Sequence, residues 1–286
     1  MKVLELSFKT TPEITLCGQA WGDATNDPVL LMHGGGQTHH SWGDTGHTMA
    51  AQGWHSLALD ARGHGASSWS DSGNYQMDYM IADLKSIIAQ LEVKPIIVGA
   101  SMGGITGLLA EGESKESICR ALVLVDIAPK VEQKGVERIF AFMSANKDGF
   151  ESIDHAAEAI VAYLPHRKKP RNNKRLEKNL RKGANGRYYW HWDPKILESW
   201  KSWNSEERMQ HERRMFEAAR KLTVPTLIVR GGISDVISEK TMAEFLEAVP
   251  HVQSVDVSDA GHMVAGDSNH AFTHAVLTFI NRLPKE

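Results

Sequence analysis

The sequence has little cysteine and little net charge. Its two cysteines, Cys17 and Cys119, are too few for a disulfide framework, and neither lies in a metal-ligand spacing. Free thiols are typical of a reducing compartment, so the expected location is the cytoplasm. The formal net charge of −3 over 286 residues predicts neither a nucleic-acid partner nor an acidic tail.

Long apolar runs are also missing. The longest ones, such as Ala121–Val125, reach only the length of a strand, whereas a helix that spans a bilayer needs about 20 apolar residues. Near the N-terminus, Glu5 and Lys9 interrupt the apolar stretch that a signal peptide would require. The sequence therefore predicts neither a membrane span nor a secretory signal.

Short runs of aliphatic residues recur along the chain, and most are continuous in apolar residues rather than alternating. Such runs are typical of strands buried on both faces, as in a parallel sheet covered by helices. Apolar residues at helical spacing lie between them, as over 77–91, and this alternation predicts an α/β fold with a mostly parallel twisted sheet. Two further strands, near 3–9 and 14–20, have a short connection that predicts an antiparallel hairpin at the sheet edge. The other expected strands are VLLM at 29–32, HSLALD at 55–60, PIIVGA at 95–100, ALVLVD at 121–126, TLIVRG at 226–231 and QSVDVS at 253–258.

The alternation of strands and helices stops between Pro129 and Leu222. Connections in compact domains are usually far shorter than this stretch of about ninety residues, which contains helical patterns but no convincing buried strand. We therefore predict a core domain of residues 1–128 and 222–286. Residues 129–221 are predicted to form a helical cap over the open end of the sheet.

The segment Gly99-Ala100-Ser101-Met102-Gly103 matches the G-x-S-x-G pattern of a strand–turn–helix nucleophile site. A strand, PIIV, precedes it and a helical pattern, GGITGLLAEG, follows it. In such a turn the neighbours of the serine must be small, and the hydroxyl is held out beside amides that favour a developing negative charge. Ser101 is therefore the predicted nucleophile. The alternative is an ordinary N-cap serine in a tight turn.

A serine nucleophile needs a base, and the base needs a group that orients it. His262 follows the run QSVDVS. The order serine, acid, histidine along the chain is the one found in folds that carry the serine in such a strand–turn–helix site. Asp235, after TLIVRG, and Asp126, at the end of ALVLVD, compete for the role of the acid, because both should lie at the carboxyl edge of the sheet. We favour Asp235, since it lies one β–α–β unit before His262. The alternative function of Asp126 is to bond loop amides.

A glycine-rich loop, His33-Gly34-Gly35-Gly36, directly follows the run VLLM. Glycines let the backbone pass close to a ligand with its amides turned inward. The amides of Gly35 and Met102 are the expected donors of an oxyanion hole. The alternative, a loop that cradles phosphates, is disfavoured because the chain contains no G-x-G-x-x-G or G-x-x-x-x-G-K-S/T pattern. No cofactor and no metal site are expected.

These segments resemble the α/β-hydrolase superfamily, and within it the branch of esterases, C–C bond hydrolases, cofactor-free haloperoxidases and epoxide hydrolases. The resemblance covers all of the chain except the predicted cap, and it implies that Ser101, Asp235 and His262 form a catalytic triad. Epoxide hydrolases and haloalkane dehalogenases carry aspartate where this chain has Ser101, so those two activities are not expected. The matching stretches are LLMHGGGQTHHSW, LALDARGHGASSW, VGASMGG, VRGGISDVIS and DAGHMVAGD.

The expected activity is therefore that of a carboxylesterase, which cleaves an ester-like carbonyl substrate through an acyl-enzyme. A C–C bond hydrolase, a lactonase, a haloperoxidase or perhydrolase, and a small-molecule receptor remain open alternatives. The aromatic segment 188–194 in the cap contains Trp190 and Trp192, which either line a substrate pocket or only pack the cap. The expected partner is a small molecule, with no membrane or nucleic acid, and homo-oligomerisation stays open.

Overall fold

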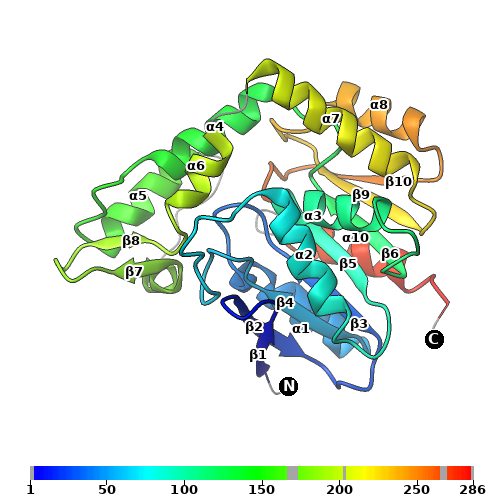
Figure 1. The fold of residues 1–286 in the computed structure, drawn as a ribbon, viewed down its shortest axis with the longest axis horizontal. Coiled ribbons are helices and arrows are strands. Elements are labelled where there is room, and N and C mark those ends of the chain that lie inside the picture. The colour runs from blue at the N-terminus through cyan, green and yellow to red at the C-terminus, as the bar shows by residue number, and fades with distance from the viewer. Residues whose placement is uncertain (1–2, 166–172, 202–203, 265–268, 285–286) are drawn as a thin grey trace.

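The computed structural model describes residues 3–165, 173–201, 204–264 and 269–284. Its strands are β1 (Val3–Lys9), β2 (Thr15–Trp21), β3 (Pro28–Met32), β4 (His55–Leu59), β5 (Ile96–Ala100), β6 (Ala121–Val125), β7 (Leu180–Lys182), β8 (Tyr188–Trp190), β9 (Thr226–Gly231) and β10 (Gln253–Val257). Eight of them form one sheet in the order β1-β2-β4-β3-β5-β6-β9-β10 (Figure 1). β2 pairs antiparallel with β1 and with β4, and the other neighbouring strands of this sheet are parallel. The predicted edge hairpin and the mostly parallel sheet are both present.

Helices cover both faces of this sheet. The helices of the described chain are α1 (Gly43–Ala51), α2 (Met77–Ile88), α3 (Met102–Gly112), α4 (Gln133–Ser144), α5 (Ile153–Tyr163), α6 (Lys195–Lys201), α7 (Ser205–Arg220), α8 (Glu239–Ala248) and α10 (Asn269–Ile280), with short 3-10 helices η1 (His39–Trp42) and η2 (Asn173–Asn179). One face packs against α2, α3, α7 and α8, and the other against α1 and α10. No helix in the described ranges has a segment both long and apolar enough to cross a membrane.

The central strand β6 shows why the strands are nearly continuous in apolar residues. All five of its residues are buried. Leu122 and Leu124 belong to the core cluster under α3 and α7, whereas Val123 and Val125 belong to the cluster under α10. Because successive side chains of a strand point to opposite faces, a strand covered on both sides needs apolar residues at every position.

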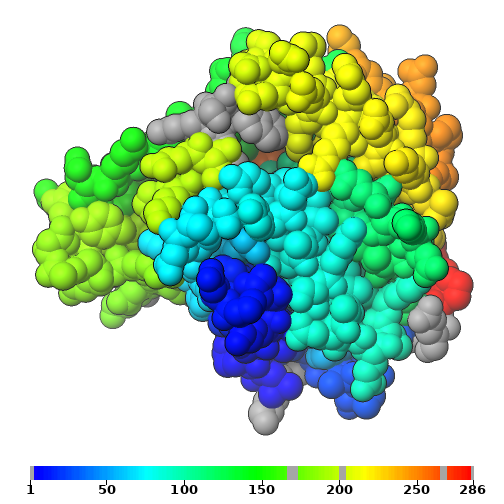
Figure 2. All heavy atoms as spheres, in the orientation of Figure 1, coloured from blue at the N-terminus to red at the C-terminus, as the bar shows by residue number. Residues whose placement is uncertain are grey.

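The segment inserted after β6 forms a lobe at one end of the sheet. Figures 1 and 2 show α4, α5, α6 and the antiparallel pair β7–β8 projecting beyond the sheet domain. The sequence predicted helices there but not this two-stranded hairpin. The end of α7 lies inside the predicted cap range, yet its residues Met215, Ala218 and Ala219 pack into the core cluster of the sheet domain. The buried side chains of the lobe include Met143, Phe150, Ala156, Trp190, Trp192, Ile196 and Leu197.

Candidate active site

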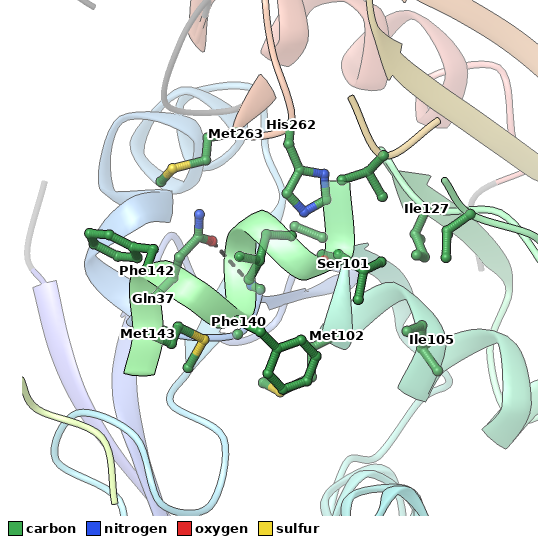
Figure 3. Close-up of a pocket in the computed structure, with 18 of the residues that line it drawn as sticks. Gln37, Ser101, Met102, Ile105, Ile127, Phe140, Phe142, Met143, His262 and Met263 are labelled. Carbon is green, nitrogen blue, oxygen red and sulfur yellow. Dashed lines mark hydrogen bonds between the residues drawn. The ribbon is translucent and has the colours of Figure 1, made fainter. Parts of the chain in front are cut away.

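Ser101 occupies the tight turn between β5 and α3. Its φ of 45° and ψ of −111° lie outside the regions that L-residues normally adopt. A Cβ on Gly99 would lie 2.5 Å from backbone atoms of Gly103, and a Cβ on Gly103 would lie 2.6 Å from the Met32 carbonyl oxygen. Positions 99 and 103, where the sequence pattern predicted small residues, therefore accept only glycine, and the strained turn places Ser101 in the wall of a cavity (Figure 3).

His262 follows β10 by five residues, and its ring faces Ser101 (Figure 3). The ring Nδ1 lies 2.7 Å from Oδ2 of Asp126, a residue with no exposed surface at the end of β6. The same carboxylate accepts hydrogen bonds from Gly231 N, at 2.9 Å, and from Ser234 Oγ. A neutral histidine that donates from Nδ1 to a carboxylate has no proton on Nε2. This arrangement turns an unprotonated nitrogen toward the serine.

The prediction that Asp235 orients His262 is wrong for this structure. Asp235 Oδ2 lies 2.7 Å from Nη1 of Arg138, and its side chain is 39% exposed. The strand order gives the reason, because β6 is the direct neighbour of β5 and Ala100 pairs with Val125. Asp126 therefore follows β6 beside the serine, in the next position of the register.

Asp235 instead connects the sheet domain to the inserted lobe. Its partner Arg138 belongs to α4 and also donates from Nη2 to the Tyr163 carbonyl oxygen, at 2.9 Å. A Cβ on Gly135, also in α4, would lie 2.2 Å from the Asp235 carbonyl oxygen, so α4 passes directly over this loop. The glycine allows this close approach, and the ion pair lies at the point where the two parts meet.

In the glycine-rich loop after β3, a buried histidine holds the carbonyl of Gly34. The buried ring of His33 accepts from Ala61 N at Nε2, at 2.9 Å, so its Nδ1 carries the proton and donates to the Gly34 carbonyl oxygen, at 2.8 Å. Burial lowers the pKa of His33, which keeps this tautomer neutral. In a trans peptide the C=O and the next N–H point to opposite sides. Anchoring the Gly34 carbonyl therefore directs the Gly35 N–H the other way.

The two amides expected in an oxyanion hole both border the cavity. Gly36 N donates a hydrogen bond to His64 Nε2 at 3.2 Å, which leaves Gly35 as the available amide of the loop. Met102 is the first residue of α3, where a helix leaves its amides without intrahelical acceptors. Within the described part of the chain, neither Gly35 N nor Met102 N donates to a protein acceptor, and both residues line the cavity with Ser101.

The cavity lies between the sheet domain and the lobe and has a volume of about 860 Å³. Trp190 and Trp192 both line it, with ring centroids 5.0 Å apart and ring planes 13° apart. Most of the other lining side chains from the lobe are apolar, and Figure 3 shows several of them around Ser101. They include Ile139, Phe140, Phe142, Met143, Ile160, Tyr163, Leu164 and Leu176. In the four described ranges, no group of three or more His, Cys, Asp or Glu residues is arranged to hold a metal ion.

Sequence reasoning missed three polar side chains near this cavity. Gln37 accepts from Gly34 N at 3.1 Å and lines the same cavity as His262 (Figure 3). His64 and His191 each bond to Gly36. His64 lies in the stretch LALDARGHGASSW, which carries part of the family resemblance, whereas His191 lies in the aromatic cap segment without any distinguishing pattern.

A family model described as alpha/beta hydrolase fold matches residues 27–268 of this chain. A 3-hydroxybutyrate-oligomer hydrolase of Cupriavidus necator is 28% identical over 252 residues, which are 85% of this chain and 85% of that protein. An esterase of Mycobacterium tuberculosis is 27% identical over 264 residues, 90% of this chain and 83% of that protein. Among solved structures, E-2-(acetamidomethylene)succinate hydrolase superposes with a TM-score of 0.83 at 21% identity, covering 98% of this chain and 100% of that one.

Proposed function

The chain belongs to the alpha/beta hydrolase family, and on this premise we propose that it is a serine hydrolase that cleaves carboxylic esters. The observation that carries the proposal is the alignment of three side chains at the carboxyl edge of the sheet. Asp126 contacts His262 at 2.7 Å, and the ring of His262 faces Ser101 in the wall of the cavity. Relatives named as an esterase and as a 3-hydroxybutyrate-oligomer hydrolase support an ester as the substrate.

In the first half of the proposed reaction, Ser101 Oγ attacks the carbonyl carbon while His262 Nε2 takes the hydroxyl proton. Asp126 stabilises the positive charge that develops on the imidazole and preserves its tautomer. The carbonyl oxygen becomes an oxyanion that accepts hydrogen bonds from the amides of Gly35 and Met102. Collapse of the tetrahedral intermediate breaks the ester C–O bond, and His262 returns the proton to the leaving alcohol.

In the second half, a water molecule attacks the acyl-enzyme. His262 Nε2 takes a proton from the water, and the hydroxide oxygen bonds to the acyl carbon. The second tetrahedral intermediate uses the same two amides, and its collapse releases the carboxylic acid and returns the proton to Ser101 Oγ. No cofactor enters either half, and each proton is passed through a single histidine.

The cavity supports an apolar substrate of substantial size. Its volume of about 860 Å³ lies in the upper range of small-molecule sites, and its lobe side is built mainly from aromatic and aliphatic side chains. Trp190 and Trp192 are the proposed contacts for the apolar part of the substrate. The two free thiols, Cys17 and Cys119, fit the proposed cytoplasmic location.

The test is a fluorophosphonate label followed by a series of p-nitrophenyl esters of increasing acyl length. The wild type should be labelled at Ser101 and should hydrolyse the esters, whereas Ser101→Ala should do neither. Lactones and 1,3-diketones assayed beside the esters identify a lactonase or a C–C bond hydrolase that uses the same side chains. An unlabelled, folded wild type that hydrolyses none of these compounds would overturn the proposal.

A further inference from the structure

His191 stands between the two tryptophans that line the cavity, but its ring makes contacts of a different kind. Its side chain is buried, with the residue 2% exposed. Nδ1 lies 2.9 Å from Gly65 N, and Nε2 lies 3.2 Å from the Gly36 carbonyl oxygen. A histidine of the inserted lobe thus bonds to two loops of the sheet domain, one of which carries the proposed oxyanion donor.

The two contacts define the protonation state of the ring. An N–H of the backbone can only donate, so Nδ1 of His191 accepts from Gly65 and carries no proton. Nε2 must then carry the single proton and donate it to the Gly36 carbonyl oxygen. Burial lowers the pKa of His191 to about 3, which agrees with this neutral tautomer.

Gly36 is consequently fixed on both of its polar groups. Its N–H donates to His64 Nε2 at 3.2 Å, and its carbonyl accepts from His191. The residue has a φ of +72°, a left-handed conformation that glycine adopts freely. The backbone of the loop therefore has little intrinsic preference for this conformation, and the two hydrogen bonds hold it there. Gly35, which lines the cavity, lies between the anchored carbonyl of Gly34 and this doubly bonded residue.

A surface arginine reinforces the same junction. Arg181 donates from Nε to the His191 carbonyl oxygen, at 3.2 Å, and from Nη2 to the Gly65 carbonyl oxygen, at 2.9 Å. Its guanidinium carbon also lies 4.4 Å from the centre of the Trp69 ring. The lobe segment around His191 is therefore tied to the Gly65 loop through both its side chain and its backbone.

We propose that His191 is a positioning residue for the glycine-rich loop of residues 33–36, which is called the oxyanion loop below. Its hydrogen bond from the lobe holds this loop in place, so stabilisation of the oxyanion requires the lobe to be packed against the sheet domain. This inference rests on the proposed ester hydrolysis. His191 acts through Gly36 and does not contact the substrate, because it is absent from the cavity wall that its neighbours Trp190 and Trp192 form. Its hydrogen bond limits the movement of the peptide that follows Gly36.

Two substitutions separate the bonds of His191. In His191→Asn the amide oxygen stands near the position of Nδ1 and can accept from Gly65, but no donor reaches Gly36. In His191→Gln the amide nitrogen stands near the position of Nε2 and can donate to Gly36. We expect kcat to fall roughly 10–100-fold in His191→Asn with KM nearly unchanged, and most of the loss to be recovered in His191→Gln.

The binding of a trifluoromethyl ketone supplies a second readout, because its adduct with serine carries an oxyanion. Its inhibition constant should rise in His191→Asn by the same factor by which kcat/KM falls. Arg181→Met, a change at the surface, should also lower kcat, but by a smaller factor than His191→Asn does. This variant also keeps the proposal testable if His191→Asn does not fold.

Tyr75→Phe is the matched control. Tyr75 Oη donates to Oδ2 of Asp193 in the lobe at 2.6 Å, so it joins the same two parts without touching the oxyanion loop. Tyr75→Phe should lower Tm and leave kcat and the inhibition constant unchanged.

Four results would overturn the inference. Wild-type kcat in folded His191→Asn would show that the bond to Gly36 does not matter, as would an effect of Arg181→Met on Tm alone. An equal fall of kcat in Tyr75→Phe and His191→Asn would show a general loosening of the lobe. A wild type that hydrolyses no ester and is not labelled at Ser101 would overturn the proposed function and this inference with it.

Discussion

Replacing Asp126 with asparagine is expected to remove almost all ester turnover. In the wild type, Asp126 Oδ2 accepts from His262 Nδ1 at 2.7 Å, and no part of the carboxylate is exposed to water. The asparagine amide can present an N–H to the ring instead, which stabilises the tautomer with its proton on Nε2. That tautomer cannot take the proton of Ser101, and losing the correct tautomer at such a site costs about 10⁴-fold in kcat.

This loss corresponds to about 5 kcal/mol of transition-state stabilisation. Asp235→Asn is the matched control, because it makes the same chemical change at the carboxylate that follows the neighbouring strand. The side chains of the pair Asp235–Arg138 are 39% and 46% exposed, and exposed ion pairs contribute only about 0–1 kcal/mol to stability. We therefore expect Asp235→Asn to retain kcat within about threefold and to change Tm little.

The assay is kcat and kcat/KM for one p-nitrophenyl ester, measured with Tm on the wild type and both variants. Asp126→Asn also weakens the bonds to Gly231 and Ser234, so a lower Tm is expected, and activity must be measured well below it. Folded Asp126→Asn with turnover within about tenfold of the wild type would refute the assignment. A large loss in Asp235→Asn with a small loss in Asp126→Asn would return the role of the acid to Asp235.

The remaining predictions concern the nucleophile, the cavity wall and the pH dependence of stability. Ser101→Ala should leave only about 10³–10⁴-fold catalysis over water in a p-nitrophenyl ester assay, with Tm nearly unchanged. Trp192→Ala should shift the preferred acyl chain to longer lengths in the same ester series, and should also lower the free energy of unfolding by about 3–5 kcal/mol, because the ring packs the lobe as well as the cavity. Burial lowers the pKa of His33, His64 and His191 in the folded state, so their contribution to stability is complete above the unfolded pKa of about 6.5 and is lost as the pH falls below it. Urea unfolding between pH 7.5 and 4.5 should show a decreasing stability, with a shallower decrease in His191→Gln; a decrease of equal slope would contradict the account for His191.

The strands could be predicted because burial on both faces leaves a strong signal. Runs such as those of β5 and β6 are apolar at every position, and no other common element of that length requires this pattern. The hairpin β7–β8 left no such signal, since each of its strands has three residues and the aromatic residues of β8 were interpreted as pocket or packing residues. The docking of α7 on the sheet domain was also missed, because an amphipathic pattern does not say which apolar surface it covers.

In the candidate site, too, some features depend on neighbouring residues and could be predicted, whereas others depend on contacts between distant parts of the chain. Ser101 and the glycines around it belong to one turn, and the sterics of that turn can be derived from five consecutive residues. The partner of His262 depends on which strands are neighbours, and the order β5-β6-β9-β10 is a property of the folded sheet. The role of His191 is even harder to predict from the sequence, since its ring bonds to loops more than a hundred residues away along the chain.

The choice between the two aspartates nevertheless had a physical basis in the sequence. Asp126 directly continues ALVLV, a run of apolar residues expected to be buried on both faces, whereas Asp235 lies in the polar loop GGISD, where water can solvate it. An ionised carboxylate at the end of a buried strand is costly unless donors surround it, so a chain that keeps one there must supply them. In the structure Asp126 accepts from Gly231, Ser234 and His262, and it takes a strained φ of 48°. The short distance along the chain from Asp235 to His262 favoured Asp235. The free-energy cost of burying a carboxylate favoured Asp126, because a buried carboxylate needs hydrogen-bond donors such as the His262 ring, and this cost is the stronger criterion.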